Sequence, residues 1–94
     1  MNELDGEWDV RRVSGVLPPL YGVRKRIGGP RGLTTLGPVR APFDVVGREL
    51  RYRGVFSGLI DTVEPEKDGW SGSARYRGRM LGRFAMSRVS ATRG

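Results

Sequence analysis

Carboxylates are the first group of side chains that could carry chemistry in this sequence, since the chain contains no His and no Cys. Thiol nucleophiles, disulfides, zinc sites of the Cys/His type and catalytic triads built on imidazole are therefore excluded. Four carboxylates fall near predicted strand ends or turns: Asp44, Glu49, Asp61 and Glu64. Asp61 differs from the others because it interrupts an otherwise apolar segment, with Ile60 pointing to the opposite face.

An inward-facing Asp61 would lose its hydration, which raises the pKa of a carboxyl group unless a cation such as Arg53 or Arg75 holds it ionised. A buried acid in an apolar barrel is able to act as a general base. A lone Asp at a strand end is more often solvated or ion-paired. We therefore expect no catalytic residue, no metal site and no cofactor in this chain.

Basic side chains are the second group with chemistry. The chain has 17 Lys and Arg against 10 Asp and Glu, a net charge of +7, which favours nucleic acid, phospholipid or a carboxylate ligand as a partner. A GC-rich genome also produces such an excess of arginine without any anionic partner. The exposed candidates are Arg24-Lys25-Arg26, Arg51, Arg53, Arg75, Arg77 and Arg79.

The tripeptide Arg-Tyr-Arg occurs at 51–53 and at 75–77, an arrangement that resembles a platform for phosphates and stacked bases. In a strand, however, the tyrosine points away from its two flanking arginines. The tyrosines then belong to the core and the arginines to the solvated surface. Nucleic-acid binding is therefore an alternative and not the first interpretation.

Large apolar side chains on predicted inner rows form the third group. Barrels of about eight strands either fill with their own side chains or hold one small ligand. The glycines on these rows either leave space for a ligand or let opposite walls approach, and the sequence leaves both outcomes open. Leu17, Leu20 and Tyr21 would form a lid. The candidate ligand-binding residues are Trp8, Tyr21, Tyr52, Phe56, Trp70, Tyr76, Met80, Phe84, Met86 and Arg88.

Strands must position these residues, because Gly and Pro interrupt the 94-residue chain too often for long helices. Leu4, Gly6, Trp8 and Val10 alternate with acidic residues, which predicts a first strand with one apolar and one acidic face. We expect residues 1–94 to form one domain, with about 90–94 as a frayed tail. Further strands are predicted at 21–27, 33–36, 39–46, 48–56, 59–63, 70–76 and 79–89, with a strong turn signal at 64–69.

The acidic row of the first strand indicates how the sheet closes. Paired antiparallel with the last strand, this row would face Arg79 and Arg83, and the second strand offers Arg24 and Arg26 as well. Closure also removes both sheet edges. We therefore expect an all-β fold, an up-and-down antiparallel meander of about eight short strands closed as a small barrel. A two-sheet sandwich is compatible with the same pattern.

Gly6-Glu7-Trp8, at the start of the first strand, resembles the Gly-x-Trp motif of lipocalins and the wider calycin group. The resemblance implies that Trp8 plugs one end of the barrel and that Arg88 packs across it. The chain is also similar to small bacterial domains of unknown function that open with a Gly-x-Trp element. It departs from lipocalins in being little more than half as long and in lacking the C-terminal helix, the disulfide and a signal peptide.

Together these features predict non-catalytic binding of a small hydrophobic or amphiphilic ligand, anionic ligands included, in a calycin-like barrel. The alternatives are a basic all-β nucleic-acid-binding module and a barrel enzyme of secondary metabolism that would use Asp61. No signal peptide or long apolar run is present, so we expect a cytoplasmic protein without membrane insertion. A homodimer is left open, and the apolar segment 16–20 is where it would form.

Overall fold

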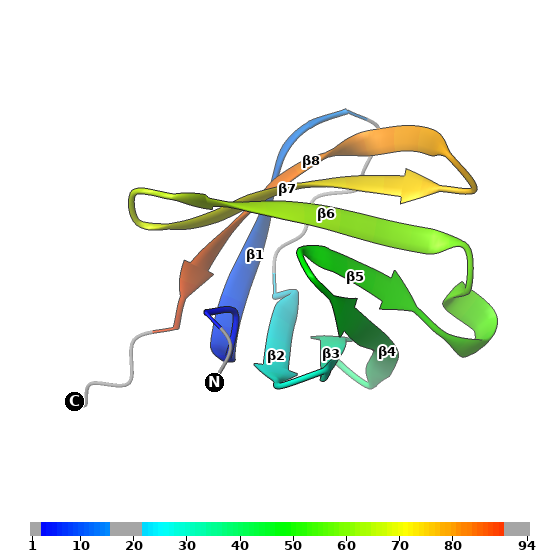
Figure 1. The fold of residues 1–94 in the computed structure, drawn as a ribbon, viewed down its shortest axis with the longest axis horizontal. Coiled ribbons are helices and arrows are strands. Elements are labelled where there is room, and N and C mark those ends of the chain that lie inside the picture. Colours follow the sequence, from blue (N-terminus) through cyan, green and yellow to red (C-terminus); the bar gives the residue numbers. More distant parts are fainter. Residues whose placement is uncertain (1–2, 16–21, 90–94) are drawn as a thin grey trace.

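Eight antiparallel strands close into a barrel in the computed structural model, which describes residues 3–15 and 22–89 (Figure 1). Each strand pairs with the next one in sequence, and β1 pairs with β8. The prediction of an all-β meander closed as a barrel is confirmed, and this architecture fits a small calycin-like barrel. The strands are β1 (Gly6–Gly15), β2 (Arg24–Gly28), β3 (Arg31–Leu36), β4 (Val39–Val46), β5 (Glu49–Tyr52), β6 (Leu59–Glu66), β7 (Gly69–Tyr76) and β8 (Arg79–Arg88), with a 3₁₀ turn, η1 (Gly54–Phe56), between β5 and β6.

The predicted elements differ from the observed ones chiefly at their ends. The predicted strand 48–56 stops at Tyr52, and the chain then turns through η1. The predicted turn at 64–69 is shorter than expected, because β6 continues to Glu66 and only residues 67 and 68 connect it to β7. Pairing along the whole β6–β7 hairpin is the reason, since each residue from Leu59 to Glu66 has a partner on β7.

The acidic row of β1 has its basic partners on β2 and not on β8. Glu7 and Asp9 lie opposite Arg26 and Arg24, and Arg24 approaches them at 3.5 and 3.1 Å. The expected pairing with Arg79 and Arg83 is wrong: Asp9 lies opposite Ser87, Arg83 lies opposite Ser14, and Arg79 pairs within the β7–β8 hairpin. Because the two strands are antiparallel, the acidic start of β1 lies beside the end of β8, whereas Arg79 and Arg83 belong to the first half of β8.

The two ends of the barrel differ, and we name them by what lies there. The Trp8 end holds Trp8 and the turns after β2, β4 and β6, whereas the η1 end holds η1 and the turns after β3 and β7. In Figure 1, η1 and the β7–β8 turn lie on the right, and the β6–β7 turn lies on the left. Because neighbouring strands are antiparallel, the first and last residues of each strand lie toward opposite ends of the barrel.

Large buried side chains concentrate inside the barrel. They include Phe43, Leu50 and Val63, which are fully buried, and Trp8 at the Trp8 end. Glycine permits the tightest contacts: a Cβ on Gly72 would lie 2.4 Å from a ring carbon of Phe84. Buried apolar side chains thus come from every strand except β3, and small residues set how closely the walls approach.

A bulge corrects one predicted row of β8. Ala74 lies opposite Gly82 but Arg75 lies opposite Met80, so Leu81 has no partner on β7. Leu81 packs against the core, while Met80 is 46% exposed. The expected inner position of Met80 is therefore wrong, because one extra residue moves a side chain to the other face of the strand.

Candidate functional site

A lysine lies inside the barrel. Along β2, Arg24 and Arg26 are exposed whereas Lys25 and Ile27 are buried, with Lys25 only 3% exposed. The sequence interpretation placed Lys25 among the surface cations because both of its neighbours are arginines. Period-two alternation from Val23, which is also buried, through Lys25 to Ile27 is the signal that assigns it to the inner face.

Three oxygens surround the Lys25 ammonium. Nζ donates hydrogen bonds to Thr34 Oγ1 at 2.8 Å, to Asp61 Oδ2 at 3.1 Å and to the Tyr52 hydroxyl. The Tyr52 hydroxyl in turn donates to Asp61 Oδ2 at 3.1 Å and lies 2.6 Å from Thr34 Oγ1. These four residues, from β2, β3, β5 and β6, form what we call the Lys25 cluster. All three ammonium hydrogens thus have an acceptor.

Large and small residues both border the charged pair in the sheet register. Lys25 lies between Trp8 and Thr34, and Asp61 lies between Leu50 and Ala74. Beyond these neighbours, Ala41 lies opposite Thr34 and Gly82 lies opposite Ala74. Small side chains thus border each charged residue on one side only.

Aromatic rings complete the surroundings of the ammonium. Nζ lies 5.4 Å from the ring centroid of Phe43, 5.2 Å from that of Tyr52 and 5.5 Å from that of Phe84. The negative faces of such rings attract a cation, and the attraction strengthens where water is excluded. Lys25 is therefore held by one carboxylate, two hydroxyls and three rings within an apolar core.

These contacts fix the protonation states of the cluster. Burial alone lowers the pKa of Lys25, but the charge of Asp61, the Tyr52 hydroxyl and the hydrogen bonds to both outweigh burial and raise it above its ordinary value of 10.5. Burial raises the pKa of Tyr52 above its ordinary value of 10.0, against the opposing effect of the Lys25 ammonium. At neutral pH Lys25 is a cation and Tyr52 is uncharged.

A protonated lysine attracts anions and is neither a nucleophile nor a base, since covalent catalysis by lysine requires the free amine. Asp61 is buried, as the sequence interpretation allowed, but its cation is Lys25 at 3.1 Å and not Arg53 or Arg75. Arg53 instead pairs with Asp44 at 3.3 Å on the surface. Within residues 3–15 and 22–89, no group of three metal-ligating side chains is found.

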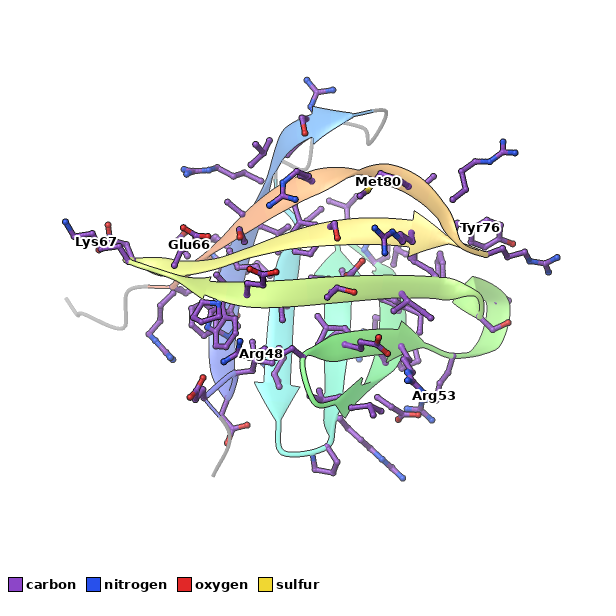
Figure 2. The ribbon with its side chains drawn as sticks, turned by 45° about the horizontal axis from the view of Figure 1, so that its top comes forward. Arg48, Arg53, Glu66, Lys67, Tyr76 and Met80 are labelled. Atoms are coloured by element: carbon purple, nitrogen blue, oxygen red, sulfur yellow. The ribbon has the colours of Figure 1, made fainter. Side chains whose placement is uncertain are left out.

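Five of the predicted ligand-binding residues are buried in the interior. Tyr52 belongs to the Lys25 cluster and Phe84 borders it, while the two tryptophans and Met86 lie in the core. Phe56 is partly buried against that core. Tyr76 and Met80 are exposed at the η1 end, where Figure 2 shows them beside the β7–β8 turn. Tyr21 and the 16–20 segment lie outside the described residues.

Trp8 and Arg88 meet at the Trp8 end. The Arg88 guanidinium carbon lies 4.3 Å from the Trp8 ring centroid, and Arg88 Nη1 donates to the carbonyl of Asp5 at 3.2 Å. The Trp8 indole nitrogen donates to the carbonyl of Leu4 at 2.8 Å. The contact expected between Trp8 and Arg88 is therefore confirmed, and it seals this end of the barrel with the N-terminal segment.

The two Arg-Tyr-Arg segments behave differently. Tyr52 is buried while Arg51 and Arg53 are exposed, as alternation predicts. Tyr76 is 43% exposed at the end of β7, and the Arg77 guanidinium lies 5.5 Å from its ring centroid. Only the second segment thus presents an aromatic ring and arginines together on the surface.

Comparisons with known proteins add no relative: no family model matches the chain, and neither a curated protein nor a solved structure matches it. Among the described residues, no helix has the length and apolar character needed to cross a membrane. The functional argument therefore rests on the Lys25 cluster and on the surface of the barrel.

Proposed function

We propose that the barrel binds a small amphiphilic anion, such as a fatty-acid-like carboxylate, without catalysis. The ligand enters at the η1 end, its anionic group points toward Lys25, and its apolar part lies among Phe56, Leu59 and Leu81. The observation that carries the proposal is the position of a protonated lysine inside an apolar barrel.

The positions of Tyr52 and Asp61 support entry from the η1 end. Tyr52 is the last residue of β5 and Asp61 is the third of β6, on the η1 side of these strands, whereas Lys25 lies opposite Trp8 in the register of β1 and β2. Phe56, Leu59 and Leu81 are only partly buried and belong to strand ends or to η1. A ligand at the η1 end thus meets apolar side chains first and the ammonium next.

The energetics of the pair also favour a role beyond stability. A buried ion pair loses hydration energy that its mutual attraction only partly restores, and apolar residues of similar volume are often as stable. The fold by itself therefore has no need of Lys25 and Asp61. Binding of an anion would give Lys25 a function, because the ammonium attracts a negative charge more strongly in the apolar interior than it would in water.

The ligand competes with the groups that already hold Lys25. Because the three ammonium hydrogens are taken by Thr34, Tyr52 and Asp61, the carboxylate of a ligand has to replace one of these acceptors. Asp61 carries the same charge as the ligand, so it opposes the anion. Affinity is accordingly set by how readily the Lys25–Asp61 contact opens.

Kinship with the calycin group is part of the same proposal. Gly6 precedes a tryptophan that is buried at one end of a closed meander barrel, and Arg88 covers that indole. These features support a lipocalin-like ancestry, and binding of small amphiphilic molecules is what that ancestry implies.

The test compares dodecanoate with dodecanol, which share a chain length but differ in charge. Each is titrated into the protein while the fluorescence of the two tryptophans and the melting temperature are measured. Dodecanoate should raise the melting temperature more than dodecanol does. Equal effects of the two compounds, or none, would overturn the proposal.

Two variants place the preference at Lys25. In Lys25→Met/Asp61→Leu the charged pair is replaced by apolar side chains, and dodecanoate should lose its advantage over dodecanol. In Asp61→Asn the competing negative charge is removed, so dodecanoate should bind more tightly than it binds the wild type. A preference for dodecanoate that survives in the double variant would show that surface arginines, not Lys25, attract the anion.

A further inference from the structure

Exposed apolar side chains gather at the η1 end of the barrel. Five of the seven large hydrophobic residues that are exposed in the described part of the chain lie there, while Val46 lies toward the Trp8 end and Val13 lines a groove with Glu66 and Asp68. Val55 in η1 is 92% exposed. The five, which we call the η1 rim, come from four strands and η1: Leu36, Val39, Val55, Tyr76 and Met80.

Charge is distributed unevenly between the two ends. Residues 10–43, 50–60 and 69–94 contain no Asp or Glu, and these stretches include every described residue of the turns and strand ends at the η1 end. Of the acids, Asp61 is buried, and surface acids such as Glu49, Glu66 and Asp68 lie toward the Trp8 end. In Figure 2, Glu66 and Lys67 lie on the left, at the β6–β7 turn, and Tyr76 and Arg53 lie on the right.

Arginines accompany the η1 rim. Arg40, Arg75, Arg77 and Arg79 are exposed near the same strand ends, and none of the four makes an ion pair with another described residue. By contrast, the arginines of β2 are ion-paired to Glu7 and Asp9. The cations beside the rim are thus available to an external anion.

We propose that the η1 rim docks on an anionic lipid surface, with the rim side chains in the acyl boundary and the four arginines at the headgroups. Apolar side chains framed by cations are suited to such an interface, and a tyrosine such as Tyr76 is favoured at the headgroup level. A second copy of this chain is disfavoured as the occupant, because two identical η1 ends would bring their arginines together. Nucleic acid would engage the arginines but would leave Val55 without a partner.

This proposal stands on exposed residues and does not depend on ligand binding at Lys25. An arginine beside an anionic lipid surface contributes about a five-fold increase in binding, the equivalent of about 1 kcal/mol. Replacing an inserted valine by serine should cost several-fold as well, because its apolar area returns to water. Both effects belong only to residues at the η1 end.

The experiment is sedimentation of the full chain with sucrose-loaded vesicles of phosphatidylglycerol and phosphatidylcholine, and of phosphatidylcholine alone. The test variants are Val55→Ser and Arg79→Gln. Matched controls at the opposite end are Val46→Ser and Lys67→Gln, which change an exposed residue of the same kind. Binding should require phosphatidylglycerol, fall about five-fold in Arg79→Gln and several-fold in Val55→Ser, and be unchanged in both controls.

Three results would overturn the proposal. No binding to either vesicle would remove it, and equal losses in test and control variants would indicate adsorption without a preferred face. Binding to a 20-base-pair DNA duplex as tight as binding to anionic vesicles, with no effect of Val55→Ser, would assign the arginines to nucleic acid. The Lys25→Met/Asp61→Leu variant should still bind vesicles, so failure of the interior site and failure of the rim are distinguishable.

Discussion

The buried pair of Lys25 and Asp61 makes a sharp prediction about stability. Lys25→Met removes the cation and leaves Asp61, which is 3% exposed, with a negative charge and no cation beside it in the described interior. Removing one partner of a buried pair costs about 3–5 kcal/mol because the remaining charge stays desolvated. A domain of 94 residues has roughly 5–14 kcal/mol of total stability, so a single substitution takes a large share of it.

The double variant should behave in the opposite way. Lys25→Met/Asp61→Leu removes both charges, and leucine keeps the branched shape of the aspartate side chain. The free energy of unfolding of this variant should therefore lie within about 1 kcal/mol of the wild type or above it. The hydroxyls of Thr34 and Tyr52 lose their charged partner but retain each other at 2.6 Å. The two substitutions should therefore be strongly non-additive, which is the signature of direct contact.

Urea unfolding followed by tryptophan fluorescence measures these differences. With a slope of about 1–3 kcal/mol per molar urea, a loss of 4 kcal/mol lowers the unfolding midpoint by about 2 M. The midpoint of the double variant should return to that of the wild type. If the double variant is as unstable as Lys25→Met, unpaired charge is not the cause, and the reasoning about the pair is refuted.

Other predictions concern the Trp8 end, the glycines and alkaline pH. Arg88→Ala should destabilise the barrel by about 1–2 kcal/mol, because the Arg88 guanidinium lies 4.3 Å from the Trp8 ring centroid and donates to a backbone carbonyl. Arg51→Ala loses only an exposed ion pair and should cost less than about 1 kcal/mol. Equal losses of stability in urea unfolding would contradict this difference. Gly72→Ala should cost about 1–3 kcal/mol because its Cβ meets an aromatic ring carbon at 2.4 Å, while Gly28→Ala, with open space and an ordinary φ, should change the melting temperature little. Because the pKa of Tyr52 is raised above 10.0 in the folded state, the contribution of Tyr52 to stability is complete below pH 10 and is lost as the pH rises from there. Above pH 10 the free energy of unfolding should therefore fall less steeply with pH in Tyr52→Phe than in the wild type. Parallel curves would refute this.

Alternation was sufficient to predict the strands, because apolar and polar residues alternate through most of the chain. Closure was predicted from the acidic row of β1 and from the Trp8–Arg88 contact; the contact is confirmed, whereas the pairing of that row with Arg79 and Arg83 is wrong. Alternation also placed Trp8, Tyr52, Trp70, Phe84 and Met86 inside, where the structure has them. These residues are large and apolar or aromatic, so their inward preference and their position in the row agree. The fold was therefore predictable wherever residue type and alternation gave the same answer.

The polar centre was not predicted because residue type and alternation disagreed there. Lys25 has a charged side chain between two arginines, and its inner position follows only if alternation is given priority over charge. Its partner Asp61 lies 36 residues away on β6, and no local pattern joins the two. The predicted inner position of Met80 was wrong for a different reason, because the bulge that turns Met80 outward depends on how β7 and β8 twist together.

The distribution of acids bears on how the net charge should be interpreted. A genome rich in GC would account for the number of arginines, but it would give no reason for the surface acids to avoid the turns and strand ends beside η1. In a meander, turns at one end of the barrel are separated by two strands in sequence, so an acid-free end requires the same absence in several distant segments. The exposed hydrophobic residues follow the same segments and, apart from Val13 and Val46, are found at the same end. Two independent properties, charge and apolar exposure, thus coincide at the η1 end, and an external surface that is both anionic and apolar satisfies them together.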